Sequence, residues 1–213
     1  MKQVVKKLLR PFYNPLKEYY EKFTFTTKLN KQQNEGRALK LVIGSSRKYD
    51  EGWIPTEAHF LNLLDEATWD RYFTENQISN MLAEHVWEHL TIDEGRKAAS
   101  VCYKYLKHGG RLRVAVPDGF HSNQQYIDYV KPGGFGDGAD DHKVLYNYKT
   151  FSSVFEDSGF RVDLLEYFDE QGNFQTKKWD IENGLIKRSI KYDKRNVNEQ
   201  PVYTSLIIDA IKL

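Results

Sequence analysis

Two histidines and a glutamate stand close together in the segment HVWEHL. Their spacing is His-x-x-Glu-His, and on a helix His85 and His89 would lie one turn apart. Two imidazoles so placed can bind zinc, with Glu88 as a general base, as in inverted zinc peptidases. Such a site needs a third ligand, and nothing downstream singles one out. The alternative is that these side chains cap and pack the start of a helix.

Further acid–base candidates follow along the chain. Asp118 comes directly after an apolar run, and His121 follows it by three residues. The glycine-rich stretch GGFGDGADDH ends with His142. Carboxylates and imidazoles at such positions can move protons, although turn hydrogen bonds and loop solubility explain them equally well. We take as candidate catalytic residues His85, Asp118, His121 and His142, and we assign no metal ligands.

A third group of residues points to ligand binding. The stretch LVIGSS places Gly44, Ser45 and Ser46 after an apolar run. Glycine lets a ligand approach the main chain, and the serines offer hydroxyl and amide groups. Glu57 follows Gly44 by thirteen residues, and an acid at the end of a neighbouring strand can accept both hydroxyls of a ribose. A surface carboxylate after a turn is the alternative for Glu57.

These residues need elements that bring them together. Short apolar runs predict strands at residues 38–43, 78–83, 112–116, 160–168 and 203–213, and HFLNLLD at residues 59–65 is a further short run. Helical spacing predicts helices over residues 93–107 and 151–159, the first ended by a left-handed cap at Gly109-Gly110. Alternating strands and helices indicate a mostly parallel sheet, with an antiparallel last pair. Ligands of such sheets bind at the carboxyl ends of the strands.

The chain divides into a basic helical arm at residues 1–38 and one domain at residues 39–213. Pro11 and Pro15 are expected to interrupt the arm, and residues 30–37 to form a linker. Residues 119–143 are predicted to be a long loop of the kind used as a lid. Residues 170–202 are predicted to form a hairpin insertion.

Composition is that of a globular protein, because 40% of the 213 residues are apolar and 29% are charged. The formal net charge is only +1, yet residues 1–40 contain ten Lys or Arg and three Glu. Because the basic residues gather in the arm and not along a groove, we expect no nucleic-acid partner. The arm is compatible with weak contact with a membrane surface, or with a solvated helix packed on the body. The oligomeric state is not indicated.

Cys102 is the single cysteine, so it has no partner for an internal disulfide and is expected to be a buried thiol. No apolar stretch approaches the length of a membrane span, and the first residues do not have the pattern of a signal peptide. We therefore expect a cytoplasmic protein.

Five segments together form a recognisable series: LVIGSS, GWIPTE, MLAEHVWEHL, LKHGGRLRVAVPD and SLIIDAIKL. Over residues 39–213 the chain resembles class I S-adenosylmethionine-dependent methyltransferases, and most of all their methyltransferase type 11 branch. The pair AEHVWEHL and LKHGGRLRVAVPD is the most specific part. The resemblance implies an α/β fold with a three-layer αβα Rossmann-like methyltransferase sheet of seven strands, ordered 3-2-1-4-5-7-6, with strand 7 antiparallel.

The resemblance also implies S-adenosyl-L-methionine as the cofactor. The residues it assigns to cofactor binding are Gly44, Ser45, Ser46, Glu57, Asn62, Ala83, Glu84 and His85. The first three would line the methionine end, Glu57 would hold the ribose, Asn62 would lie on the adenine side, and the last three would border the sulfonium and the acceptor. Methyl transfer from this cofactor depends on aligning acceptor, methyl and sulfur more than on covalent catalysis.

We therefore expect a methyltransferase with a small-molecule or sugar-containing acceptor. The first motif is Gly44-Ser45-Ser46 where the family has Gly-x-Gly, the segment from Gly44 to Glu57 is short, and Ser79 stands where the family has Asp. These departures keep a second hypothesis open, a non-catalytic methyltransferase-like binding or scaffold protein. The zinc hydrolase suggested by His85, Glu88 and His89 is the third.

Overall fold

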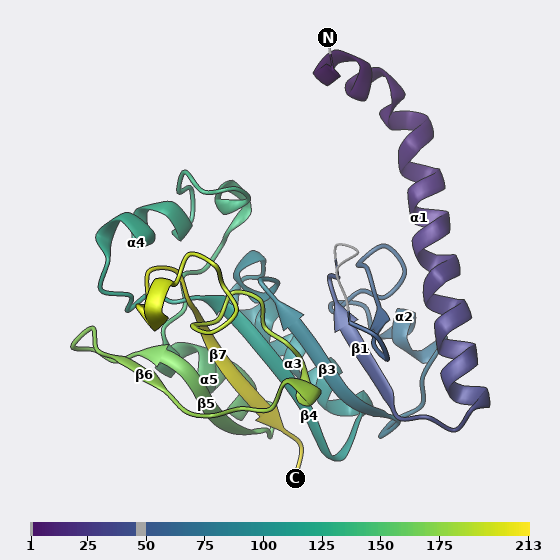
Figure 1. The fold of residues 1–213 in the computed structure, drawn as a ribbon. Coiled ribbons are helices and arrows are strands. Elements are labelled where there is room, and N and C mark those ends of the chain that lie inside the picture. Colours follow the sequence, from purple (N-terminus) through teal and green to yellow (C-terminus); the bar gives the residue numbers. More distant parts are fainter. Residues whose placement is uncertain (1, 46–49) are drawn as a thin grey trace.

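The computed structural model describes residues 2–45 and 50–213 (Figure 1). Its seven strands are β1 (Leu39–Ile43), β2 (Ile54–Pro55), β3 (Ile78–Glu84), β4 (Leu106–Pro117), β5 (Arg161–Phe168), β6 (Phe174–Thr176) and β7 (Ser205–Ile211). They form one sheet in the order β2-β1-β3-β4-β7-β5-β6. Strands β2, β1, β3 and β4 pair in parallel, and β7 is antiparallel to both β4 and β5. The sheet, flanked by helices, is the Rossmann-like methyltransferase fold that the sequence predicts, with strand 7 antiparallel.

The edges of the sheet differ from the order expected for the family. Beyond β2, residues 59–65 form turns and not a third strand. The reason lies in Asn62, whose Oδ1 accepts the Leu64 N–H (2.8 Å) and whose carbonyl accepts the Trp69 Nε1–H (2.8 Å). These bonds direct the chain into the short helix α2 (Glu66–Asp70). The seventh strand is instead β6, a hairpin partner of β5 at the opposite edge.

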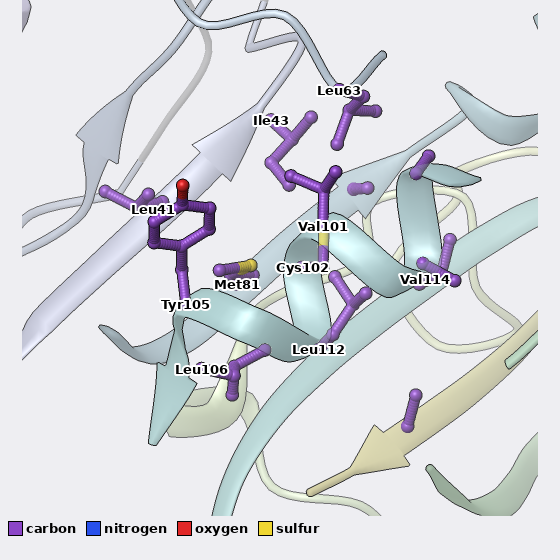
Figure 2. Packing of buried hydrophobic residues seen from close by; sticks show 14 of the residues in the cluster. Leu41, Ile43, Leu63, Met81, Val101, Cys102, Tyr105, Leu106, Leu112 and Val114 are labelled. Carbon is purple, nitrogen blue, oxygen red and sulfur yellow. The ribbon is translucent and has the colours of Figure 1, made fainter. Parts of the chain in front are cut away.

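Helices α3 (Ile92–Tyr105) and α5 (Tyr148–Glu156) lie together behind the sheet in Figure 1. Helix α3 begins with a capping box, because Thr91 and Glu94 each accept the other's backbone N–H through a side-chain oxygen. The apolar side chains of α3 pack against those of three parallel strands (Figure 2), and the cluster includes Leu41, Ile43, Met81, Val101, Cys102, Tyr105, Leu112 and Val114. Burial of Cys102 is as predicted, and it raises the pKa of the thiol.

The predicted cap at Gly109-Gly110 is wrong. Helix α3 ends at Tyr105, and Leu106 is already extended and paired with Ile78, as the first residue of β4. The two glycines lie inside β4, where the pairing register shifts and Gly109 has a φ of +72°. A bulge and a helix cap both use a residue with positive φ, so a glycine such as Gly109 is compatible with either structure.

The opposite face of the sheet carries a smaller apolar cluster, formed by Val42, Trp53, Leu82, Ala115, Leu165, Ile186 and Ile207, with Trp179 packed against it. Residues 177–204 cover part of this cluster. They run in front of the sheet in Figure 1 and contain the 3₁₀ helices η3 (Ile181–Asn183) and η4 (Val197–Glu199). Arg113 anchors this segment, because its Nη1 donates to the carbonyls of Asp180 (2.7 Å) and Gly184 (2.6 Å).

Helix α1 (Lys2–Asn34) continues through Pro11 and Pro15, so the expected interruption is absent. It also includes most of the expected linker. Buried Phe25 and Leu29 attach its second half to the body. Residues 119–143 are not only a loop, because they contain α4 (Gln124–Val130) and the 3₁₀ helix η2 (Ala139–Asp141). Among the described residues, no helix is both long and apolar enough to cross a bilayer.

Candidate functional site

The carboxyl ends of β1, β2, β3 and β4 bring polar residues to one edge of the sheet. Gly44 follows β1, Glu57 lies just beyond β2, His85 follows β3 and Asp118 follows β4. The order of the sheet reverses between β1 and β3, because the chain goes from β1 outward to β2 and then returns to β3 on the other side. Ligands of open α/β sheets bind at such a switch point.

The turn after β1 requires glycine. Gly44 has a φ of +60°, and a Cβ there would lie 3.0 Å from Val86 Cγ2. The next residue joins the ends of two strands, since Ser45 N donates to Thr56 O (3.1 Å) and Ser45 Oγ donates to Glu57 Oε1 (2.9 Å). The predicted pair of Ser45 and Glu57 is therefore in direct contact. Ser46 lies outside the described residues.

Two cavities adjoin at this pair. The larger, about 600 Å³, opens above the ends of β1 and β3 and is lined in part by Gly44, Ser45, Trp53, Glu84, His85 and His142. The smaller, about 320 Å³, is lined by Tyr20, Glu21 and Thr24 of α1 together with Ser45, Pro55, Glu57 and Phe60. Ser45 lines both cavities, so the two adjoin at this residue. Both volumes are in the range of small-ligand sites.

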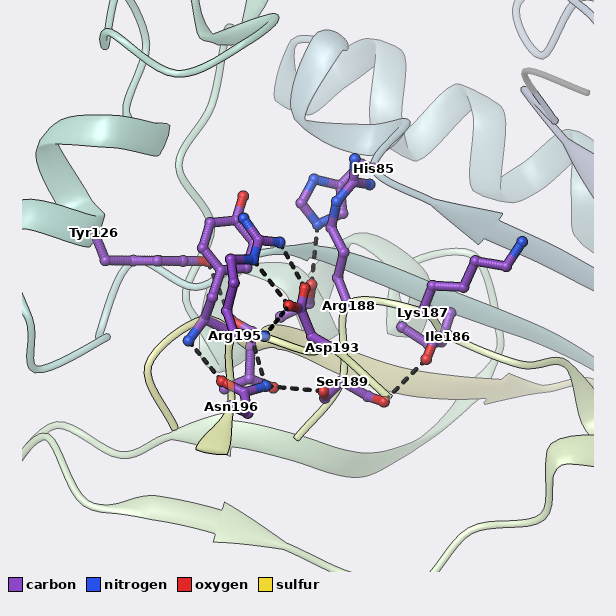
Figure 3. A network of polar contacts seen from close by, with 12 residues as sticks. His85, Tyr126, Ile186, Lys187, Arg188, Ser189, Asp193, Arg195 and Asn196 are labelled. Carbon is purple, nitrogen blue, oxygen red and sulfur yellow. Dashed lines mark hydrogen bonds and ion pairs between the residues drawn. The ribbon is translucent and has the colours of Figure 1, made fainter. Parts of the chain in front are cut away.

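Residues 177–204 place charged side chains over the larger cavity. The carboxylate of Glu84 accepts the backbone N–H of Arg188 (2.7 Å) and of Lys187 (3.2 Å). Asn196 closes the segment on itself, because its Nδ2 donates to Ser189 O (3.0 Å) and Tyr203 O (2.8 Å) (Figure 3). The cavity wall contributed by this segment includes Lys187, Arg188, Asp193 and Arg195. The sequence prediction missed these residues, although the charged run KRSIKYDKR was a visible signal.

His85 is held rigidly at the cavity wall. Its φ is +58°, a conformation that residues other than glycine seldom adopt. Its Nδ1 lies 3.1 Å from Glu88 Oε1, and its Nε2 lies 3.0 Å from Ser205 Oγ. Because a carboxylate accepts, Nδ1 carries the proton, and Nε2 then accepts the hydroxyl of Ser205. Both ring nitrogens are thus engaged, which gives His85 a positioning role in this arrangement.

Glu88 lies on the 3₁₀ helix η1 (Trp87–His89) and is fully buried. Burial acts to raise the pKa of its carboxyl, but the His85 ring, a backbone hydrogen bond and the His89 ring together outweigh burial and hold the pKa below its ordinary value. The segment from His85 to His89 is not an α-helix, so these two histidines are not one helical turn apart as the zinc-peptidase pattern requires.

A different histidine joins Glu88 instead. His142 Nε2 lies 4.0 Å from Glu88 Oε1, and the His89 and His142 rings meet edge to face with centroids 4.9 Å apart. One ligand atom each from Glu88, His89 and His142 lie within 4.8 Å of one another. This is the one such group of three found in the described part of the chain. His142, which the sequence offered as a candidate catalytic residue without a position, lies in the cavity wall.

Asp118 and His121 are buried behind the site. The Asp118 carboxylate accepts the N–H of Phe120 (2.9 Å) and of Phe168 (2.8 Å), which ties the end of β4 to the end of β5. Burial raises the pKa of Asp118 to about 6. The His121 ring stacks on Tyr126 with centroids 4.0 Å apart, and burial lowers the pKa of His121 to about 4. Neither residue is among the described residues that line the two cavities.

The remaining predicted residues also support the framework. Asn62 holds the turn before α2, and Ala83 is fully buried in β3, paired with Ile43 and Val114. The structure thus gathers Gly44, Ser45, Glu84, His85 and His142 around one cavity and Glu57 at the adjoining one, and it places Asn62, Ala83, Asp118 and His121 outside both linings.

Neither a protein-family model nor a curated protein matches the chain. Among solved structures, a SAM-dependent methyltransferase from Archaeoglobus fulgidus is 14% identical, with 99% of this chain and 93% of that chain covered and a TM-score of 0.46. A SAM-dependent methyltransferase of Thermotoga maritima, described as a possible histamine N-methyltransferase, is 12% identical, with 98% and 100% covered and a TM-score of 0.49. At these values the similarity concerns the course of the backbone and identifies neither a reaction nor a ligand.

Proposed function

We propose that this protein is an S-adenosylmethionine-dependent methyltransferase acting on a small-molecule acceptor. The observation that carries the proposal is the pair of adjoining cavities at the switch point of the sheet, which meet at the hydrogen bond from Ser45 to Glu57. An elongated ligand with a nucleoside at one end and a charged group at the other suits this shape.

The residues present fit such a cofactor. In the smaller cavity, Glu57 offers a carboxylate to the hydroxyls of a ribose, and Pro55 and Phe60 offer apolar surface to a base. In the larger cavity, Gly44 lets the ligand approach the main chain closely. A methionine group carries a carboxylate and an ammonium, and the wall of this cavity offers Lys187 as a cation and Glu84 as an anion.

When bound, S-adenosylmethionine supplies an electrophilic methyl group on a sulfonium. The part of the protein is then to bind, align and shield. Glu84 and His85 are fixed by hydrogen bonds to residues 187–188 and by the Glu88 and Ser205 contacts, so the floor of the cavity is rigid. The segment 177–204 covers the cavity from above and limits the access of water.

Calorimetric titration with S-adenosylhomocysteine tests the proposal. We expect saturable binding by the full chain, weakened roughly 10–100-fold in Glu57→Ala, because hydrogen bonds to a charged acceptor contribute about 1.5–3 kcal/mol. Glu156→Ala, an exposed change at the end of α5, is the matched control and should leave binding unchanged. Absence of binding at millimolar ligand overturns the proposal. Binding without methyl transfer to any of a broad acceptor panel favours the non-catalytic alternative.

A further inference from the structure

Glu88 is a buried carboxylate whose surroundings leave it incompletely satisfied. Its side chain has no exposed surface, Oε1 has only the Nδ1 of His85 within reach, at 3.1 Å, and Oε2 has no hydrogen-bond donor among the described residues. Burying a carboxylate in this state is costly unless it is paired or coordinates a metal. Glu88 is also among the residues that line the larger cavity.

Two imidazoles beside Glu88 have the tautomer that a metal ligand needs. His142 Nδ1 lies 2.7 Å from the carbonyl of Val130, and a carbonyl only accepts, so Nδ1 carries the proton. The lone pair of His142 is therefore on Nε2, the atom 4.0 Å from Glu88 Oε1. His89 Nδ1 is held in the same way by the carbonyl of Asp141 (3.3 Å), which leaves its Nε2 as the lone-pair nitrogen. Metal-binding histidines commonly donate their second N–H to a carbonyl.

Main-chain hydrogen bonds hold the two halves of this cluster in place. Glu88 and His89 lie on η1, and His142 follows η2. The carbonyl of Glu88 accepts the N–H of Lys143 (2.7 Å) and of Val144 (3.3 Å), so the segment that carries His142 is fastened to η1. The cluster is thus set by backbone geometry before any ion arrives, as a built site requires.

We propose that Glu88, His89 and His142 bind one divalent transition-metal ion of the zinc class in the wall of the larger cavity. Two imidazoles and one carboxylate are a donor set that zinc takes in sites that keep a position open. Ligand atoms about 2.1 Å from a tetrahedral ion lie about 3.4 Å apart. The observed distances within 4.8 Å therefore need only a modest side-chain movement to close. Magnesium and calcium prefer oxygen ligands and do not suit this set.

The open position faces the cavity, which gives the ion a use. Resting on the proposed function, we infer that the acceptor is a hydroxyl compound whose oxygen binds the ion. A bound hydroxyl ionises more readily and releases its proton to solvent. Its oxygen then forms the bond to the methyl carbon as the carbon–sulfur bond breaks, with the electron pair left on sulfur. This role makes a separate histidine base unnecessary, in keeping with the engaged nitrogens of His85.

Metal titration of the chelator-treated full chain tests the site. We expect one Zn²⁺ per chain by calorimetry and elemental analysis, no matching uptake of Mg²⁺, and, with Co²⁺, the intense visible absorption of a four- or five-coordinate ion. His142→Gln and His89→Gln should weaken Zn²⁺ binding at least about 100-fold, beyond the 10–100-fold that loss of an outer-shell partner causes. His108→Gln, an exposed change near the amino end of β4 and so at the far end of the sheet from the cluster, is the matched control.

The outcomes separate this inference from the proposed function. His89 is one-third exposed, so His89→Gln tests the site even if changes at buried Glu88 prevent folding. If wild type fails to take up stoichiometric Zn²⁺, or if His89→Gln and His142→Gln bind it as tightly as His108→Gln, the metal site is refuted. S-adenosylhomocysteine binding is measured in chelator, so it can succeed where zinc binding fails, or the reverse. Zn²⁺-dependent methylation of hydroxyl but not amine acceptors supports the inferred substrate class, and metal-independent methylation refutes it.

Discussion

Arg113 fastens residues 177–204, which cover the larger cavity, to the sheet. It is fully buried in β4, and its Nε and Nη2 donate to the two carboxylate oxygens of Asp209 on β7 at 2.8 and 2.9 Å. Its Nη1 holds the carbonyls of Asp180 and Gly184, and its guanidinium lies 4.7 Å from the centre of the Trp179 ring. One side chain therefore joins two strands to the segment that covers the larger cavity.

Replacing Arg113 with Met should lower the free energy of unfolding by about 3–5 kcal/mol, the cost of breaking one side of a buried ion pair. Among the described residues, the charge of Asp209 then keeps only Arg111, which is partly exposed, as an ion-pair partner. The carbonyls of Asp180 and Gly184 lose their donor at the same time. For a chain of 213 residues, the change corresponds to roughly 6–20 °C in melting temperature.

The assay is urea unfolding of wild type, Arg113→Met, Asp209→Leu and the double variant. Because removal of both partners leaves no fully buried charge unpaired, only the partly exposed Arg111, the double variant should be more stable than the sum of the single changes predicts, by about 2 kcal/mol or more. Limited proteolysis should cut within residues 177–204 in Arg113→Met sooner than in wild type. A loss below about 1 kcal/mol in Arg113→Met, the range of an exposed pair, would refute this reasoning.

Three further predictions concern the framework. The pKa of His121 is about 4 in the folded protein and 6.5 for the free side chain, so the unfolded chain binds more protons between these pH values. The unfolding free energy of wild type therefore loses about 3 kcal/mol from this group as pH falls from 6.5 to 4. Asp118, whose folded pKa is raised to about 6, acts in the opposite direction, and it does so in wild type and variant alike. The unfolding free energy of His121→Phe should therefore gain about 3 kcal/mol relative to wild type as pH falls over that interval, as measured by urea curves. Parallel pH profiles of the two proteins would contradict this. Phe25→Ala should cost about 3–5 kcal/mol and exposed Phe23→Ala less than about 0.5, measured by thermal unfolding, and equal losses would show that α1 is not anchored at Phe25. Gly110→Ala, whose Cβ would lie 2.6 Å from Lys107 O, should cost about 1–3 kcal/mol through this clash, and Gly109→Ala should cost about 1–2 kcal/mol through its φ of +72°, although its Cβ has open space; a loss below about 0.5 kcal/mol for either change in denaturant unfolding would argue against the bulge geometry.

The sequence predicted the centre of the sheet because its strands are continuous apolar runs, buried on both faces. Residues 39–43, 78–84 and 205–211 form β1, β3 and β7 much as expected. It could not predict the edge beyond β2, because the run HFLNLLD is apolar enough for a strand. The hydrogen bonds of Asn62 to Leu64 N–H and Trp69 Nε1–H decide against a strand. The second of these bonds depends on how Trp69 packs in three dimensions.

The candidate site was predictable where residues are tied to strand ends. Gly44, Ser45, Glu57, Glu84 and His85 lie at or within two residues of the carboxyl ends of strands, so the topology alone brings them to one end of the sheet. His142 could be named but not placed, because the hydrogen bonds from Lys143 and Val144 to Glu88 determine its position. Lys187 and Arg188 reach the cavity only because Arg113 and Glu84 hold distant main-chain groups, and no local pattern carries that information.

Because the segment between Gly44 and Glu57 is short, the outer wall of the smaller cavity has to come from elsewhere in the chain. With turns in place of a strand beyond β2, the wall of the smaller cavity needs another source, and helix α1 supplies it through Tyr20 and Thr24. The arm therefore contributes to the site, and the packing does not follow a division at residue 38, because Phe25 lies in the core of the body. Because α1 provides both core residues and cavity wall, ligand binding in the smaller cavity depends on how firmly α1 packs on the body. Changes that loosen Phe25 should therefore weaken ligand binding along with stability.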